Sequence, residues 1–190
     1  MRGKVFADAF LYDAKLVRHG KPTSFRLELF RTDSVIALGG RGYLGKGALR
    51  GRMTSDSLVV YFPATNEYLR ETISELLNSF GCSLARTSLD AIEFFARPPD
   101  RTTTDSSLQV VLVRDDKKRP VYGLFSDECA WRVEIEYERN KEAWRVRELV
   151  FDDGAGVTLT ARLRESRSHV GIPAARFEIS WPPDALRLTP

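Results

Sequence analysis

The sequence predicts an α+β fold: a large, curved antiparallel β-sheet with two short helices packed on one of its faces. Three observations predict it. Apolar and polar residues alternate with a period of two over much of the chain, several of these stretches are long for strands, and helical periodicity is confined to one region between two runs of strands. Because 190 residues suit a single β-rich domain, we expect one domain spanning residues 1–190.

The first run of strands occupies the N-terminal third of the chain. In the second of these strands, Phe25, Leu27 and Leu29 alternate with Arg26 and Glu28, which leaves one apolar face, as is typical of antiparallel sheets. Strands of nine or more residues extend for about 30 Å at about 3.3 Å per residue, and long antiparallel strands twist and curl the sheet. The strands of this run are expected over residues 5–17, 23–31, 33–39, 43–53 and 57–62.

Two helices are expected in the middle of the chain. In residues 71–80, the apolar positions Ile73, Leu76, Leu77 and Phe80 follow the i, i+3, i+4, i+7 spacing of an amphipathic helix. A second stretch opens near Ser88 and ends at a pair of prolines. Its apolar residues are Leu89, Ile92, Phe94 and Phe95.

A second run of strands follows the helices. The clearest alternation in the chain is here: Trp131, Val133, Ile135 and Tyr137 alternate with arginine and glutamate. Short polar linkers separate this strand from the next two, which is typical of hairpins. We expect a strand over residues 108–114 and a four-strand meander over residues 129–181, whose last strand is 176–181.

Signatures of catalysis and of metal binding are missing from the sequence. There is no nucleophile elbow, zinc-protease motif, phosphate loop or dinucleotide fingerprint, and His19 and His169 lie in loop-like contexts away from any metal-ligand spacing. The glycine-rich stretch over residues 39–47 lacks the Lys-Ser/Thr pair of a phosphate loop, so we interpret it as a bend in the sheet. We therefore expect no enzyme, no metal and no cofactor.

Charge and cysteine content leave two further questions open. The first 50 residues hold ten basic and four acidic side chains, which fits either an anionic membrane surface or an ordinary solvated face. Nucleic acid is not expected, because the basic residues are interleaved with acids rather than clustered with aromatics. Cys82 and Cys129 could form a disulfide in an oxidising compartment or remain buried thiols. The apolar runs are too short to span a bilayer.

The expected helices are small compared with the sheet that they must cover. Two helices of about ten residues reach only about 15 Å each, whereas ten strands present a wide apolar face. Three arrangements remain open from the residues alone. The sheet could close into a barrel with the helices as a plug, remain half open around a hydrophobic cavity, or be filled by its own side chains.

Three segments resemble the LolA-like proteins of the Gram-negative envelope, a superfamily that includes LolA, LolB and RseB. Residues 50–68, RGRMTSDSLVVYFPATNEY, are similar to a sheet segment of that family, in which a turn led by Asp precedes an apolar strand ending in Tyr and Pro. Residues 24–36, SFRLELFRTDSVI, resemble the preceding strand pair, and residues 175–185, ARFEISWPPDA, resemble the closing segment. With the strand–helix–strand order, the resemblance covers most of the chain.

The resemblance implies an unclosed half-barrel wrapped around a short helical plug. It implies binding of the acyl chains of lipids or lipoproteins in a hydrophobic cavity without catalysis, for transport or localisation to the outer membrane. The location implied is the periplasm, or the outer membrane through a lipid anchor, with a signal peptide removed before residue 1; we expect a monomer. Arg31 lies where LolA has an arginine that helps hold its lid closed, although Thr32 replaces the proline that usually follows. The alternative is an envelope sensor or protein-interaction module on the same fold.

We predict the residues of this cavity from the two patterns together. The sheet would contribute one apolar wall and the helices would contribute the plug, although for any single residue a place in an ordinary core is the simpler interpretation. The predicted wall consists of Phe25, Leu27, Leu29, Trp131, Val133, Ile135 and Tyr137, and the predicted plug residues are Leu76, Leu77, Phe80, Phe94 and Phe95.

Overall fold

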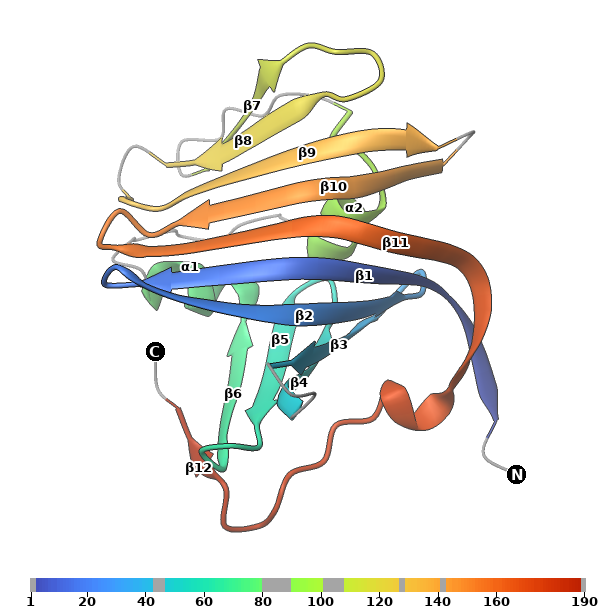
Figure 1. Ribbon diagram of the computed structural model, residues 1–190, viewed down its shortest axis with the longest axis vertical. Helices are drawn as coiled ribbons and strands as arrows, with labels where there is room; N and C mark the ends of the chain where they lie inside the picture. The colour runs from blue at the N-terminus through green and yellow to red at the C-terminus, as the bar shows by residue number, and fades with distance from the viewer. Residues whose placement is uncertain are drawn as a thin grey trace.

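A computed structural model describes residues 3–42, 47–79, 90–100, 108–126, 129–140 and 143–188, and within them twelve strands form one sheet (Figure 1). The strands are β1 (Lys4–Arg18), β2 (Lys21–Arg31), β3 (Ile36–Arg41), β4 (Gly47–Met53), β5 (Ser57–Phe62), β6 (Glu67–Thr72), β7 (Gln109–Arg114), β8 (Val121–Phe125), β9 (Arg132–Asn140), β10 (Ala143–Asp152), β11 (Val157–Pro173) and β12 (Leu186–Arg187).

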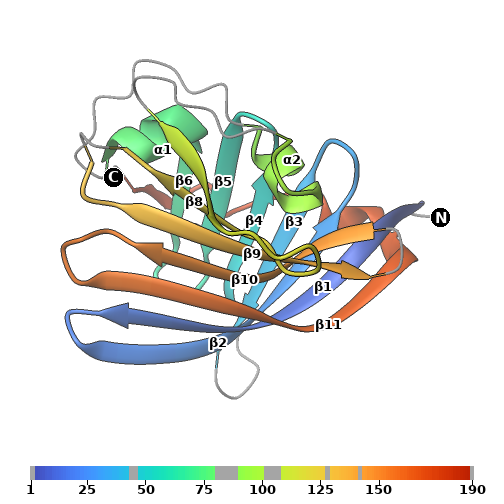
Figure 2. The ribbon, with the colours of Figure 1, turned by 90° about the horizontal axis from the view of Figure 1, so that it is seen from above.

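The sheet is strongly curved and does not close on itself. Its strand order is β12-β6-β5-β4-β3-β2-β1-β11-β10-β9-β8-β7, so β12 and β7 are its two edges. Every neighbouring pair is antiparallel except β12 with β6. The long strands β1 and β11 pair at the centre, and the two halves of the sheet bend toward each other from this seam (Figure 2). The curved, unclosed antiparallel sheet expected from the sequence is confirmed.

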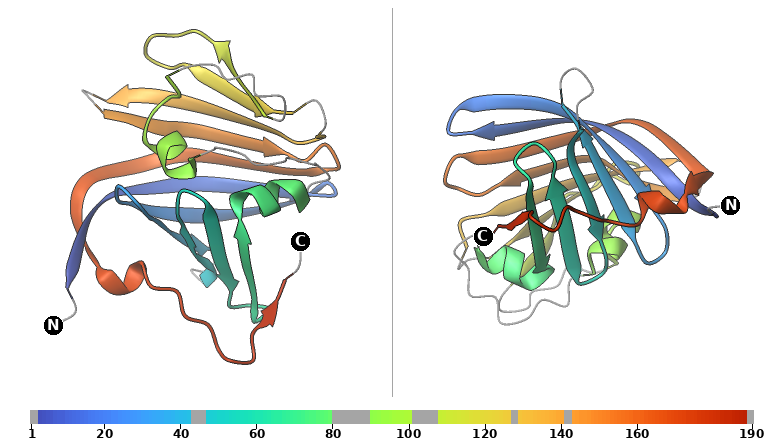
Figure 3. Two further views of the ribbon diagram at one scale, coloured as in Figure 1. Left: turned by 180° about the vertical axis from the view of Figure 1, so that it is seen from behind. Right: turned by 90° about the horizontal axis from the view of Figure 1, so that it is seen from below.

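Two short helices lie on the concave side of the sheet (Figure 3). At the start of α1 (Ile73–Ser79), the Thr72 backbone N–H donates to the Glu75 carboxylate and the Glu75 N–H donates to the Thr72 hydroxyl, a reciprocal cap. Before α2 (Ala91–Ala96), the Asp90 carboxylate accepts from the second and third backbone N–H groups of the helix. Phe80, Ser88 and Leu89 of the expected helices lie outside the described residues, and among the residues described a helical plug is not clearly shown. A 3₁₀ turn, η2 (Ala174–Arg176), follows β11.

The apolar core consists of two clusters, one in each half of the sheet. We call them the N-half cluster and the C-half cluster, and Phe95 of α2 contacts both. The buried members of the N-half cluster are Tyr12, Ala14, Leu29, Ile36, Met53, Ile73, Ala91, Ile92 and Ala161. The buried members of the C-half cluster are Leu108, Val110, Leu124, Trp131, Ile135, Tyr137 and Val146.

The prediction of a strand over residues 176–181 is wrong. The segment after η2 has no ladder partner until β12, and instead crosses the convex face of the sheet (Figure 3). The alternation of Phe177, Ile179 and Trp181 arises because these side chains are half-buried while their neighbours are exposed, and Trp181 stacks on Tyr68 with ring centroids 4.6 Å apart. Three of the four strands expected in this meander form, as β9, β10 and β11, and they continue an antiparallel meander that begins with β7 and β8. Three strands, β6, β8 and β12, were not expected.

The structure bears on the state of the cysteines and on membrane-spanning helices. Cys129 is disulfide-bonded, and the chain has one other cysteine, Cys82, which lies outside the described residues. No helix in the described ranges is long and apolar enough to cross a membrane.

Candidate functional site

The concave face of the sheet carries most of the residues that the sequence predicted to line a cavity. The register explains why: Tyr12 pairs with Leu27 and Ala14 pairs with Phe25, so alternate residues of β1 and β2 point to the same face. In the other half, Ile135 of β9 pairs with Leu149 of β10. Side chains from strands far apart in the sequence thus form one apolar surface.

The structure divides the predicted wall residues between the two clusters. Leu29 is buried in the N-half cluster, and Phe25 and Leu27 pack against it while half-buried. In the C-half cluster, Trp131, Ile135 and Tyr137 are buried and Val133 is half-buried. All of these residues have core contacts, and their role in ligand binding stays a prediction.

The predicted plug residues are only partly within the described structure. Phe94 and Phe95 of α2 pack on the sheet, Phe94 against the C-half cluster and Phe95 against both clusters. Leu76 of α1 is half-buried. The side chain of Leu77 and all of Phe80 lie outside the described residues.

The two clusters differ in the size of some of their buried side chains. Large side chains fill the C-half cluster, where Trp131 and Tyr137 are 1% and 0% exposed. The N-half cluster has Ala14, Ala91 and Ala161 among its buried members. Large apolar side chains remain partly exposed around both clusters. Those packed against the N-half cluster are Phe10, Phe25, Leu27, Leu38, Leu58, Phe95 and Leu163, and those packed against the C-half cluster include Phe94, Tyr122, Val133, Trp144, Leu149 and Phe151.

Arg31 ties α2 to the end of β2. Its guanidinium donates to the Phe95 carbonyl and pairs with the Asp8 carboxylate at 2.9 Å. The same group lies over the Phe10 ring, 5.1 Å from the centroid. The Arg31 side chain is only 14% exposed, so these contacts satisfy a cation that is largely removed from water. The last carbonyls of a helix have no partner within the helix, and Arg31 supplies one of them with a donor.

Tyr137 provides the matching tie from the other half of the sheet. Its hydroxyl donates to the Phe94 carbonyl at 2.7 Å, so adjacent carbonyls of α2 are held by one side chain from β2 and one from β9. Tyr12 makes a similar bond, donating to the Val146 carbonyl at 2.9 Å across the central seam. Burial raises the pKa of both tyrosines well above the usual value, and both remain neutral donors.

A hollow of about 500 Å³ opens beside Arg31, where β1, β10 and β11 come together. Phe10 and Trp144 give it apolar walls, and Asp8, Arg31 and Arg145 give it charged ones. Arg145 is itself paired with Glu138 at 2.6 Å. The hollow therefore combines an apolar lining with fixed charges at one end of the half-barrel.

Sequence reasoning missed several residues of this face. Tyr12 and Phe10 were not named, although the alternation of apolar residues within 5–17 places both on the face shared with Ala14. The pairing of Arg31 with Asp8 had no local signal, because it depends on the register of β1 against β2.

Comparisons with known proteins support the architecture. No protein-family model matches the sequence, and no curated protein does. A LolA superfamily protein from Nitrosomonas europaea is similar in structure, with 10% identity and a TM-score of 0.50 over 91% of this chain and 90% of that one. An uncharacterized conserved protein from Thermus thermophilus has 12% identity and a TM-score of 0.46 over 95% of this chain and 89% of that one.

A third solved structure, a DUF1329 family protein from Desulfovibrio piger, has 13% identity and a TM-score of 0.47, covering 90% of this chain and 89% of that one. Identities this low speak to the fold alone, and the match to the LolA superfamily protein reaches the similarity at which shared architecture can be argued. The chain has a LolA-like fold.

Proposed function

We propose that this protein binds the acyl chains of lipids or lipoproteins on the concave face of its sheet, without catalysing a reaction, and that it serves their transport or localisation at the outer membrane. The observation that carries the proposal is the set of partly exposed apolar side chains around the N-half cluster. Such side chains, gathered on one concave face of a LolA-like fold, suit a flexible hydrocarbon ligand.

The hydrophobic effect supplies enough free energy for such a ligand. Removing a sixteen-carbon acyl chain from water is worth about 12 kcal/mol at about 0.8 kcal/mol per methylene, whereas a net hydrogen bond contributes about 1 kcal/mol. Affinity would therefore follow the apolar area of the face more than any polar contact. Phe25, Leu27 and Leu29 would form the wall nearest the ligand.

In this proposal α2 acts as a lid over the acyl chain. Its two ties, from Arg31 and Tyr137, hold backbone carbonyls through side-chain donors, and both can be released without breaking the sheet. The remaining face of α2 carries Phe94 and Phe95 onto the apolar surface. Lid opening would expose that surface to an incoming chain.

The disulfide supports a location outside the cytoplasm. Disulfides persist in oxidising compartments such as the bacterial periplasm and are rare in the cytosol. Cys129 is disulfide-bonded, which fits a periplasmic protein or one held at the outer membrane.

A titration with a fluorescent fatty acid tests the proposal. We compare Leu27→Asn with Leu11→Asn: both leucines are half-buried and lie on the neighbouring strands β2 and β1, but on opposite faces of the sheet. The Leu27 variant should bind about tenfold more weakly, which corresponds to about 1.4 kcal/mol, and the Leu11 variant should bind like the unmodified protein. Circular dichroism checks that both are folded. Absence of saturable binding by the unmodified protein would refute the proposal.

A sensor or protein-interaction module is the second candidate. The observation in its favour is the C-half cluster, where Trp131, Tyr137 and Val146 fill the interior with the protein's own side chains. This role would show partner binding that survives complete removal of lipid, with no fatty-acid uptake.

A further inference from the structure

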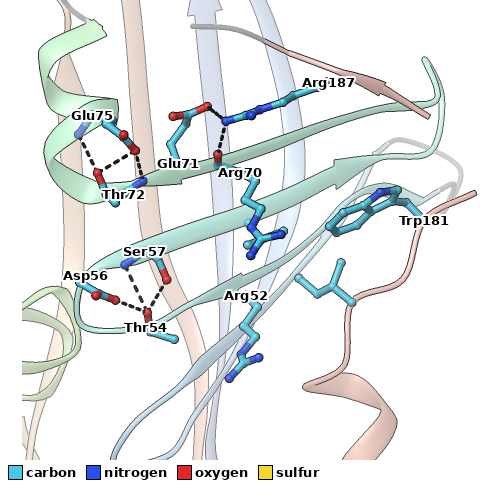
Figure 4. A pocket seen from close by; sticks show the side chains of 12 residues that line it. Arg52, Thr54, Asp56, Ser57, Arg70, Glu71, Thr72, Glu75, Trp181 and Arg187 are labelled. Atoms are coloured by element: carbon cyan, nitrogen blue, oxygen red, sulfur yellow. Dashed lines mark hydrogen bonds and ion pairs between the residues drawn. The ribbon is translucent and has the colours of Figure 1, made fainter. Parts of the chain in front are cut away.

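The convex face holds a second hollow, on the opposite side of the sheet from the proposed acyl site. Its volume is about 810 Å³, and it lies between the strands β4, β5 and β6 and the C-terminal segment that crosses them (Figure 4). Val59, Ile179 and Trp181 give it apolar surface, and Arg52 and Arg70 project into it from β4 and β6. This size is in the range of small-molecule sites.

Arg52 and Arg70 are aligned across the sheet. Arg52 pairs with Val59 in the β4–β5 ladder, and Val59 pairs with Arg70 in the β5–β6 ladder. The three residues therefore form one row on the convex face, with the arginine Cα atoms about 10 Å apart at about 4.8 Å between neighbouring strands. Two arginine side chains are long enough to reach a shared ligand above Val59 from both sides.

Neither guanidinium group has a partner among the residues that the structure describes. Both are exposed, and neither guanidinium forms an ion pair or a hydrogen bond with any of those residues. Figure 4 shows both side chains without an interaction drawn to their charged ends. Most arginines on the convex face of the other half have an acid beside them: Arg132 pairs with Glu134 and Arg162 pairs with Glu148.

The acids that line the hollow are engaged elsewhere. The Asp56 carboxylate accepts from the Thr54 hydroxyl at 2.9 Å. Glu75 caps α1, where hydrogen bonds from the Thr72 backbone N–H and hydroxyl lower the pKa of its carboxyl. Glu71 pairs with Arg187 at 3.2 Å. None of these acids lies within ion-pair distance of Arg52 or Arg70, so the two positive charges are left for a ligand.

The C-terminal segment gives the hollow a wall. Trp181 stacks on Tyr68 of β6, and Arg187 donates to the Arg70 carbonyl at 3.1 Å. These contacts hold the segment against the face of the sheet from which Arg52 and Arg70 project. Apolar surface around a charged group excludes water and strengthens its attraction for an opposite charge.

We propose that this hollow binds a phosphate group, held by the guanidinium groups of Arg52 and Arg70 above Val59. Two planar guanidinium groups match the oxygens of a phosphate by bidentate hydrogen bonding. The group belongs either to a soluble phosphate monoester or to a phospholipid headgroup. The site is independent of the acyl-binding proposal, since it uses the other face of the sheet.

The test has a soluble arm and a membrane arm. In the first, glycerol 3-phosphate and inorganic phosphate are titrated while the Arg52 and Arg70 side-chain N–H signals are followed by NMR. In the second, the protein is sedimented with phosphatidylcholine vesicles that contain or lack phosphatidylglycerol. Saturable shifts in the first arm identify a soluble ligand; binding confined to vesicles with phosphatidylglycerol identifies a headgroup.

Two double variants that remove the same charge distinguish binding in this hollow from nonspecific electrostatic attraction. Arg52→Gln with Arg70→Gln should weaken whichever binding is seen at least about tenfold, as expected for the loss of charge-assisted hydrogen bonds. The control, Arg162→Gln with Arg167→Gln, removes the same charge from exposed positions on β11 and should leave binding within about twofold. No binding in either arm, or equal losses in the two variants, overturns the proposal.

Discussion

The two halves of the sheet share one concave surface, but their interiors are built differently. The C-half cluster is closed around Trp131 and Tyr137, whose side chains are almost fully removed from water. The N-half cluster has three alanines among its buried members, and both clusters have a rim of half-buried phenylalanine and leucine. A buried tryptophan contributes a large apolar area to stability, whereas a buried alanine contributes little. We infer that the C-half contributes more to the stability of the fold, while the half-buried Phe25 and Leu27 of the proposed acyl site lie in the N-half.

The largest effect on stability is expected from truncating the buried Trp131 side chain in the C-half cluster. Trp131→Ala should lower the free energy of unfolding by about 3–5 kcal/mol, because it leaves a large cavity in a filled interior. Phe25→Ala, at a half-buried position in the N-half, should cost about 1–2 kcal/mol, because a half-buried side chain removes less apolar area from water on folding. Urea unfolding measures both. Equal costs would show that the two halves are packed alike.

A smaller effect is expected from releasing the two ties on α2. Tyr137→Phe leaves the Phe94 carbonyl without its donor and should cost about 1–3 kcal/mol, since the Tyr137 side chain is buried and the bond is partly buried. Arg31→Met should cost about 1–2 kcal/mol through loss of its contacts with Asp8 and the Phe95 carbonyl. Hydrogen exchange at the backbone N–H groups of Phe94 and Arg97, both bonded within α2, should become faster in each variant. Unchanged exchange would show that neither side chain holds the helix.

The smallest effect is expected in alkaline solution. The folded-state pKa of Tyr12 and of Tyr137 is raised by burial, so their contribution to stability is complete below the unfolded value of about 10 and is lost as the pH rises above it. Absorbance titration should show these two phenols ionising only as the protein unfolds. Titration of all six tyrosines at ordinary values in the folded protein would contradict the burial of both clusters.

Period-two alternation predicted most of the sheet because burial on one face acts directly on the sequence. The strand expected over residues 57–62 coincides with β5, and the expectation for residues 5–17 falls within β1. β6 gave no such signal: Glu67, Leu69 and Glu71 share a face, so two acids interrupt its apolar pattern. The false strand at 176–181 shows the opposite error, because packing against the outside of a sheet produces the same alternation without a ladder.

The site was less predictable than the sheet. Periodicity placed Leu27 and Ile135 on apolar faces, and the structure has them on one concave surface. Periodicity could not tell which of these side chains are fully buried and which are half-buried, since that depends on which strands meet across the sheet. The row formed by Arg52 and Arg70 depends on two registers at once, and no local pattern contains that information.

The pairing of β1 with β11 also bears on how the chain reaches its native state. Strand β1 finds its central neighbour only when Val157–Pro173 has been synthesised, long after β1 itself. Contacts between such distant segments slow folding. A nascent chain would accordingly stay without its central seam until β11 has been synthesised, so β1 and β2 must remain a separate hairpin during that time.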